Sequence, residues 1–151
     1  SDLLLRERKI CGILTEASLD LESGGLDWAV LGIGFNLADP PEGWGELEGI
    51  AGSVFGERAP EGSRARLAAE FLGRFWELYK SFDTEKALAG YKKRQAAIGR
   101  TVEVISLAAP PKSAVAVDVD RDFRLVVRYP DGREDALSSG EVRIIIEKEE
   151  K

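Results

Sequence analysis

The sequence has no histidine, no methionine and a single cysteine, Cys11, among its 151 residues. Without histidine, Ser-His-Asp catalysis, Cys-His catalysis and a histidine-ligated metal site are excluded within this chain. A single cysteine forms no internal disulfide and no cysteine metal cluster, which fits a reducing, cytoplasmic setting. Any chemistry must therefore use Lys, Arg, Asp, Glu, Asn and backbone amides, the groups that stabilise charge around phosphate.

Long apolar runs and an excess of positive charge are also missing. No stretch approaches the roughly 20 apolar residues that cross a bilayer, and no secretory signal is visible, so we expect no membrane contact. The formal charge of −6 disfavours nucleic-acid binding, which depends on many Lys and Arg contacts to phosphate. Because a native reading frame begins with methionine, we also expect the chain to be part of a longer protein.

The first part of the chain begins with three strands. Apolar runs at residues 2–6, 9–17 and 27–37 predict these strands, and the turn at Gly24-Gly25 favours antiparallel pairing. Their near-continuous apolar character predicts a sheet that is covered on both faces.

Two helices are expected after the strands. A loop rich in Pro, Gly and acidic residues follows, over residues 38–62, with a short helix near residues 49–55. Apolar residues at helical spacing then predict one helix over residues 64–80 and a second from about residue 84 to residue 97.

The pattern changes after Gly99, where short alternating segments replace helical spacing. Four or five short strands in about 50 residues predict a small β-barrel. The predicted strands cover residues 101–105, 113–119, 123–129 and 142–146, with a hairpin turn at 130–133. The fold class is therefore α+β, with a boundary near residue 98 that gives domains 1–98 and 99–151.

Two segments carry the candidate chemistry. Lys9 begins an apolar strand that contains Gly12, and the last predicted strand of the first part ends with Gly32, Gly34 and Asn36. Glycine weakens a strand, so its presence needs a reason, such as close approach of a ligand, a bulge or tight packing. Lys9 by itself is consistent with a solvated surface charge.

The order of these segments resembles the C-terminal portion of biotin protein ligases, also called biotin–[acetyl-CoA-carboxylase] ligases. The resemblance runs from Asp2-Leu3-Leu4-Leu5 through Arg8-Lys9-x-x-Gly-Ile-Leu-Thr-Glu and Gly-x-Gly-x-Asn to Ser139-Gly140-Glu141-Val142, and covers essentially the whole chain. It implies part of a mixed or antiparallel sheet with helices, similar to class II aminoacyl-tRNA synthetases, over residues 1–98. It further implies an SH3-like barrel over residues 99–151.

The resemblance also implies a reaction. Biotin ligases use ATP and Mg2+ to convert biotin into biotinyl-5′-AMP, and then transfer biotin to a lysine of a biotin carboxyl carrier protein. The first step joins two anions, the biotin carboxylate and the α-phosphate, and therefore needs cationic and amide stabilisation.

The matching positions imply roles for individual residues. Lys9 and Asp2 are the expected catalytic residues, with Asp2 acting on the metal or on the incoming lysine amine. Lys9 and Asn36 are expected at ATP, and no residue is assigned as a metal ligand. The expected biotin-binding residues are Lys9, Gly12, Leu14, Gly32, Ile33 and Gly34.

The sequence departs from the family pattern at one end. Ser1 stands where the family has Asn, and the family's glycine- and arginine-rich loop is not in this chain. We therefore expect little or no ligase activity from this chain alone, and dependence on the missing N-terminal half of the catalytic domain or on a partner chain, with a homodimer left open. The alternative is a noncatalytic interaction module. An anion- or nucleic-acid-binding barrel is disfavoured by the acidic charge.

Overall fold

A computed structural model describes residues 2–20, 22, 24–106, 109–138 and 141–144. Ser1 and the Ser139-Gly140 pair of the last motif lie outside the described residues. The chain divides into two compact units, residues 1–77 and 78–151, and this division falls inside helix α1 (Ser63–Lys80). A domain boundary near residue 98 stays a prediction.

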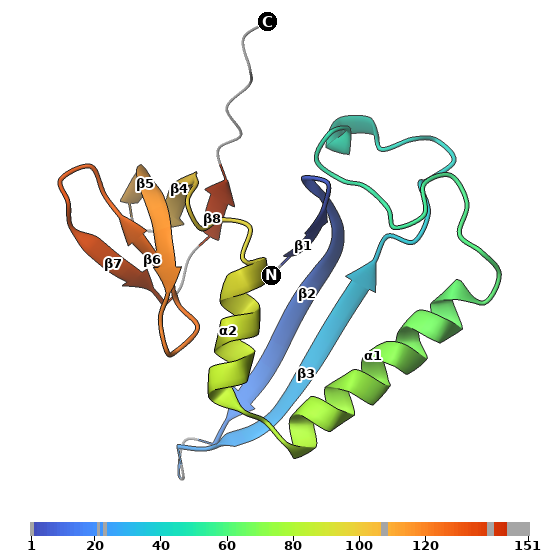
Figure 1. Ribbon diagram of the computed structural model, residues 1–151, viewed down its shortest axis with the longest axis horizontal. Coiled ribbons are helices and arrows are strands. Elements are labelled where there is room, and N and C mark those ends of the chain that lie inside the picture. The colour runs from blue at the N-terminus through green and yellow to red at the C-terminus, as the bar shows by residue number, and fades with distance from the viewer. Residues whose placement is uncertain (1, 21, 23, 107–108, 139–140, 145–151) are drawn as a thin grey trace, which may run out of the picture. The chain divides into compact units, whose positions relative to one another are not determined.

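The first unit contains a three-stranded antiparallel sheet with the order β1-β2-β3 (Figure 1). Its strands are β1 (Asp2–Leu5), β2 (Arg8–Leu19) and β3 (Leu26–Phe35), which confirms the three predicted strands to within two residues at each end. Arg6 and Glu7 form the turn between β1 and β2, with φ of 51° and 64°. The short turn keeps Asp2 and the start of β2 on neighbouring strands.

The pairing of β2 with β3 sets which residues share a face of the sheet. Gly12 pairs with Gly34, and Leu14 pairs with Gly32. Since side chains alternate between the two faces of a strand, these four residues lie on one face, which we call the glycine face. Ile33 lies between Gly32 and Gly34, so its side chain points to the opposite face.

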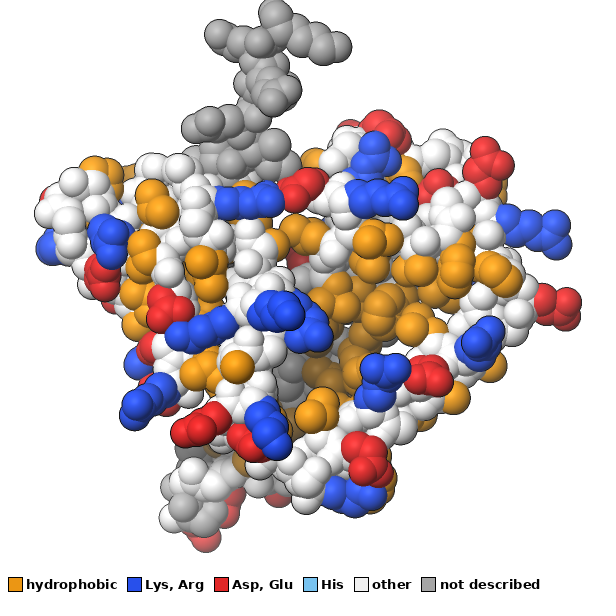
Figure 2. All heavy atoms as spheres, in the orientation of Figure 1, with side chains coloured by type: hydrophobic (Ala, Val, Ile, Leu, Met, Phe, Trp, Pro, Cys, Tyr) orange, Lys and Arg blue, Asp and Glu red, His pale blue; other side chains and the backbone are white. Residues whose placement is uncertain are grey.

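The two faces differ in how well the chain covers them. On the opposite face Cys11 is buried and Ile13, Ile33 and Phe35 are partly buried. On the glycine face Leu14 is 65% exposed and Val30 is 56% exposed. In the view of Figure 2, hydrophobic side chains gather in the region of β2 and β3. The expectation of two covered faces is therefore not met within the described residues. Burial on the opposite face is confined to the end near Cys11, and Leu31 on the same face is 42% exposed. An apolar run indicates that a strand favours burial, but it does not specify which segment covers the strand.

The loop after β3 does not form the helix predicted near residues 49–55. A short 3-10 helix, η1 (Gly45–Leu47), precedes that segment instead. Gly49 and Gly56 bracket the segment with φ of 80° and 74°, a left-handed conformation that interrupts a right-handed helix. Helix α1 then begins at Ser63, which confirms the prediction of a helix over residues 64–80.

The second unit begins with the end of α1 and continues with helix α2 (Thr84–Arg94). Asp83 caps α2, since its Oδ1 accepts a hydrogen bond from the Lys86 amide at 3.0 Å. The helix ends before the predicted residue 97 because Gln95 is already extended, with ψ of 113°. Lys92 joins α2 to the following sheet through an ion pair with Asp118 at 2.7 Å.

A five-stranded antiparallel sheet with the order β7-β6-β5-β4-β8 completes this unit. Its strands are β4 (Thr101–Ser106), β5 (Ala109–Val119), β6 (Leu125–Arg128), β7 (Glu134–Leu137) and β8 (Glu141–Ile144). The buried core cluster consists of Ala97, Val102, Ala114, Ala116 and Val127. Two helices and two antiparallel sheets confirm the α+β class, while the SH3-like form of this sheet stays a prediction.

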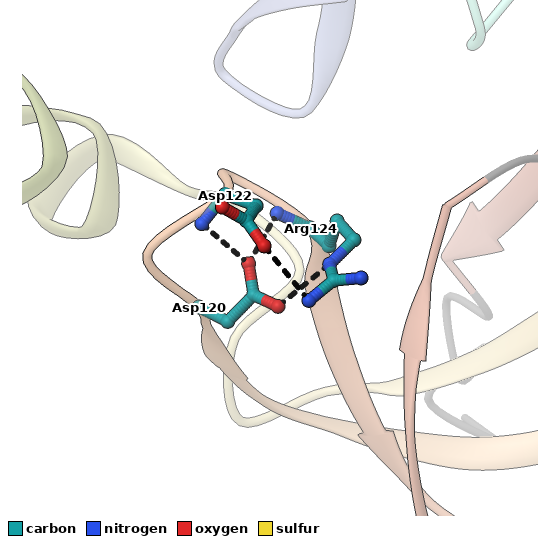
Figure 3. Close-up of polar contacts among 3 residues, drawn as sticks. All are labelled: Asp120, Asp122 and Arg124. Carbon is teal, nitrogen blue, oxygen red and sulfur yellow. Dashed lines mark hydrogen bonds and ion pairs between the residues drawn. The ribbon is translucent and has the colours of Figure 1, made fainter.

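A carboxylate organises the turn between β5 and β6 (Figure 3). Asp120 Oδ1 accepts hydrogen bonds from the backbone amides of Asp122 and Arg124, both at 2.9 Å. The Arg124 guanidinium closes the turn on Asp120 Oδ2 at 2.7 Å and on Asp122 at 3.0 Å.

Neither helix in the described part of the chain is long and apolar enough to span a membrane.

Candidate functional site

Lys9 and Asp2 are paired in the first unit. The Lys9 Nζ lies 2.8 Å from Asp2 Oδ1, and the two side chains are 44% and 49% exposed. The structure therefore brings together the two residues that were expected to be catalytic. Each retains enough exposure to meet a ligand from solvent.

A β-bulge explains why Lys9 reaches the glycine face. Leu3 pairs with Cys11, but the next residue, Leu4, pairs with Lys9, so Ile10 is an extra residue in β2. In a regular strand, residues three apart point to opposite faces, and Lys9 would point away from Gly12. A bulge re-aims the side chains beside it. A Cβ at Gly12 would lie 3.6 Å from Lys9 Cε and 3.7 Å from Lys9 Nζ, so the Lys9 side chain passes directly over Gly12.

The other two glycines leave the sheet surface bare. Among the described residues, no atom beyond the chain neighbours lies within 4 Å of the place where a Cβ of Gly34 would be. Near that of Gly32 lies only the Leu14 carbonyl oxygen, at 3.6 Å. The pairing of β2 with β3 is also regular across both glycines. Neither tight packing nor a bulge within the described residues accounts for them, which favours close approach of a ligand.

Asn36 follows β3 and holds several backbone segments together. Its Nδ2 donates hydrogen bonds to the Lys9 carbonyl at 3.3 Å and to the Gly52 carbonyl at 3.1 Å. Its own carbonyl accepts a hydrogen bond from the Val54 amide at 2.9 Å. Lys9 is tied to the same loop, since its amide donates to the Ile50 carbonyl at 2.8 Å and its carbonyl accepts from the Gly52 amide at 3.0 Å. The main chain at Lys9 is therefore fixed by the loop as well as by the sheet.

Asp39 and Gly52 support this loop, and neither was identified from the sequence. Asp39 Oδ1 accepts hydrogen bonds from Ser53 Oγ at 2.6 Å and from Trp44 Nε1 at 3.2 Å. Trp44 is partly buried and held by this hydrogen bond. A Cβ at Gly52 would lie 2.9 Å from Arg8 Cβ, so only glycine fits there without a shift. A glycine in a loop was the only sequence signal for this contact.

One cavity of this unit lies elsewhere. A cavity of about 650 Å3 is lined by the β1–β2 turn, Asp39 and residues 52–56. It includes none of the residues expected to bind biotin or ATP. On the glycine face Leu14 and Val30 remain more than half exposed, so the described residues leave this face open.

The electrostatics of the site argue against a catalytic role for Cys11. Burial raises the pKa of the Cys11 thiol, and the nearby Asp2 carboxylate raises it further while Lys9 partly lowers it. A protonated, buried thiol is a poor nucleophile. Over residues 2–20, 22, 24–106, 109–138 and 141–144, no group of three or more carboxylates or thiols could hold a metal. Mg2+ stays an expectation, because one or two carboxylates together with the phosphates of ATP are enough to hold it.

Comparison with known proteins identifies the fold. Neither a protein-family model nor a curated protein matches the sequence. Solved structures do match it: the apo biotin protein ligase from Aquifex aeolicus is 19% identical with a TM-score of 0.76, over 95% of this chain and 62% of that chain. The same ligase in complex with biotin and ATP is 18% identical with a TM-score of 0.72, over 95% of this chain and 59% of that chain. A mutant of that ligase with biotin is 19% identical, with a TM-score of 0.73 over 94% of this chain.

These likenesses extend over nearly all of this chain but only part of the ligases. The chain spans less than two thirds of their length, between 58% and 62% for the structures named. Identities below 20% establish shape and not activity. The chain has a biotin protein ligase-like fold.

Proposed function

We propose that this chain is part of an ATP-dependent biotin protein ligase. The reaction joins biotin to AMP, releasing pyrophosphate, and then transfers biotin to a lysine of a biotin carboxyl carrier protein. The observation that carries the proposal is the Lys9 ammonium held over Gly12 on the glycine face. A ligase-like fold over 95% of the chain supports it.

In the first step, a carboxylate oxygen of biotin attacks the α-phosphorus of ATP, and the bond to pyrophosphate breaks. Both reactants are anionic, so a cation at the point of attack lowers the barrier more than it stabilises either reactant alone. Lys9 is suited to bridge the biotin carboxylate and the α-phosphate. Its carbonyl and amide are fixed by the loop at Ile50 and Gly52, which limits the positions that the ammonium can take.

The glycine face provides the floor for biotin in this proposal. Gly32 and Gly34 expose backbone that the bicyclic ring of biotin can approach closely, because no Cβ intervenes. Gly12 lies under the Lys9 side chain, so biotin would meet this position beside the ammonium. Leu14 offers an apolar side chain on the same face. Ile33 contributes through its backbone only, since its side chain points to the opposite face.

The second step requires an acceptor lysine as a neutral amine. The amine nitrogen attacks the carbonyl carbon of biotinyl-5′-AMP, the bond to the phosphate oxygen breaks, and AMP leaves. In this proposal Asp2, which is paired with Lys9, takes the proton that the amine loses. At the nucleotide end, Asn36 lies next to the Lys9 backbone, because its Nδ2 donates to the Lys9 and Gly52 carbonyls.

The remaining expectations belong to the same proposal. The second unit corresponds to the SH3-like barrel, the acceptor is a carrier protein, and the setting is cytoplasmic. Full activity requires the part of the ligase that this chain does not contain, supplied in the same polypeptide or by a partner.

Calorimetric titration with biotin and with biotinyl-5′-AMP tests the proposal. Lys9→Ala should weaken binding of biotinyl-5′-AMP more than binding of biotin, because only the former carries the phosphate. Lys112→Ala, which removes an exposed lysine from β5 in the other unit, is the control and should change neither affinity. Equal losses for both ligands would refute the phosphate role of Lys9, and no binding even with the missing half supplied would refute the ligase function.

One observation favours a second candidate, a partner-dependent interaction module. Leu14, Trp28 and Val30 are at least half exposed on the glycine face, an apolar surface that a partner chain could cover. The module would bind a second polypeptide and leave biotin and biotinyl-5′-AMP unbound in the assembled state. The same titration, repeated on the complex with that polypeptide, separates the two functions.

A further inference from the structure

We propose that Asn36 is a positioning residue that couples Lys9 to the loop segment Ile50–Val54. Its role at the nucleotide would then be exerted mainly through Lys9. The effect on ligands rests on the proposed function, whereas the coupling itself is a property of the fold.

The Asn36 side-chain amide donates to two backbone carbonyls, those of Lys9 and Gly52. Nδ2 has two N–H groups, and the Lys9 and Gly52 carbonyls lie at 3.3 and 3.1 Å from it. The Lys9 carbonyl accepts a second hydrogen bond from the Gly52 amide at 3.0 Å, which uses both of its lone pairs. One side chain therefore ties the end of β3 to β2 and to the loop.

The two hydrogen bonds from Asn36 Nδ2, which we call the clamp, lie beside an interruption in the pairing of β1 with β2. Ile10, the next residue, is the extra residue of the bulge, so the ladder between β1 and β2 is interrupted there. The Lys9 amide turns to the loop and donates to the Ile50 carbonyl at 2.8 Å. The direction of the Lys9 side chain over Gly12 thus depends on the contact between the loop and β2. The hydrogen bonds of Asn36 stabilise that contact.

The chemistry of the clamp is specific to asparagine. Aspartate has the same shape but presents oxygen, which repels the two carbonyls, and serine offers one donor in place of two. The close approach also needs glycine at residue 52, where a Cβ would lie 2.9 Å from Arg8 Cβ. A residue that only contacts ATP would have no need of these backbone partners.

Amide hydrogen exchange of the 151-residue chain, measured by NMR without any ligand, tests the coupling. In Asn36→Asp, the Lys9 and Gly52 amides should exchange at least tenfold faster, because the loop undocks more often. The Val127 amide, in the core of the other unit, should keep its exchange rate and so report that the chain is folded. Unchanged exchange at both Lys9 and Gly52 would overturn the proposal.

A matched control separates the clamp from the change of charge. Gln95→Glu makes the same amide-to-acid change in the second unit, where Gln95 contacts Tyr91 and Ala97. It should leave exchange at Lys9 and Gly52 unaltered, and acceleration there would overturn the assignment to Asn36. If Asn36→Asp does not fold, Asn36→Ser keeps one donor and should give a smaller acceleration at the same two amides.

A double-mutant cycle with biotinyl-5′-AMP as the probe tests the route through Lys9. Asn36→Asp should weaken binding in the wild-type background but change it less than twofold in Lys9→Ala, because the residue through which it acts is gone. Equal losses in both backgrounds would assign Asn36 to direct nucleotide contact and overturn the route. If wild-type chain binds no biotinyl-5′-AMP with the missing half supplied, the proposed function fails, while the exchange result still decides the coupling.

Discussion

The Lys9 ammonium lies 2.8 Å from Asp2 Oδ1, above Gly12 on the open face of a three-stranded sheet. Both side chains are close to half exposed, and an ion pair of this exposure contributes at most about 1 kcal/mol to stability. The ion pair therefore positions the Lys9 ammonium and contributes little to the stability of the fold. A ligand anion that approaches Lys9 must compete with Asp2.

Asp2→Asn should raise the affinity for biotinyl-5′-AMP by about fivefold at most, because it removes the competing carboxylate from Lys9. The midpoint of urea unfolding should change little. Asp27→Asn, which removes the same charge from an exposed site on β3, is the control and should leave the affinity unchanged. A fall in affinity of Asp2→Asn, measured by calorimetry without Mg2+, would show that Asp2 assists ligand binding and does not oppose it.

Gly34→Ala should separate folding from biotin binding. A Cβ at Gly34 meets nothing within 4 Å, and alanine in a strand is more stable than glycine by about 0.5–1 kcal/mol. The variant should thus be at least as stable as wild type but bind biotin at least tenfold more weakly, since the methyl group occupies the floor of the site.

Gly73→Ala is the matched control for Gly34→Ala. Gly73 lies in α1, and a Cβ there also meets nothing within 4 Å. It should raise the stability while leaving the affinity for biotin unchanged. Wild-type affinity in Gly34→Ala, with both variants folded, would contradict the placement of biotin on the glycine face.

Gly52→Ala should destabilise the first unit. The new Cβ would lie 2.9 Å from Arg8 Cβ, an atom fixed close to the backbone, so β2 or the loop must move. Overpacking of this kind costs about 1–3 kcal/mol. Urea denaturation followed by tryptophan fluorescence measures the loss, and stability equal to that of Gly73→Ala would rule out the close packing of the loop on β2.

The strands and the candidate residues could be predicted from the sequence because their signals are local. Apolar runs located β1, β2 and β3, and the Lys9, Gly12 and Gly34 positions stood out within them. Apolar periodicity located α1 in the same way. None of these predictions required knowledge of contacts between distant residues.

The arrangement of the site could not be predicted, because it depends on pairing across the chain. The bulge at Ile10, which turns Lys9 onto the glycine face, arises from the register between β1 and β2 and has no local sequence signal. The clamp from Asn36 to Gly52 joins two carbonyls, and backbone groups are the same at every residue. The open glycine face likewise depends on which segments cover it, a matter that apolar content leaves undecided.

Acidification should destabilise the second unit through Asp120. The Arg124 backbone amide, together with its guanidinium and the Asp122 amide, holds the pKa of this carboxyl below its usual value of about 3.9, although burial acts in the opposite direction. A carboxyl with a lowered pKa in the folded state stabilises that state above its unfolded pKa, and this contribution is lost as the pH falls through the folded pKa. Between pH 6 and about pH 4, Asp120→Asn should therefore unfold at a lower temperature than wild type.

The difference in unfolding temperature between Asp120→Asn and wild type should shrink as the pH falls below about 4. Once Asp120 is protonated, it loses its charge and accepts weaker hydrogen bonds from Arg124 and Asp122. Thermal unfolding followed by circular dichroism from pH 6 to pH 2.5 measures this trend. Asp135→Asn removes the same charge from an exposed site on β7 and should lower the midpoint less at pH 6. A difference between Asp120→Asn and wild type that stays constant over the whole range would mean that the turn is stabilised by its shape alone and not by the ionised carboxylate.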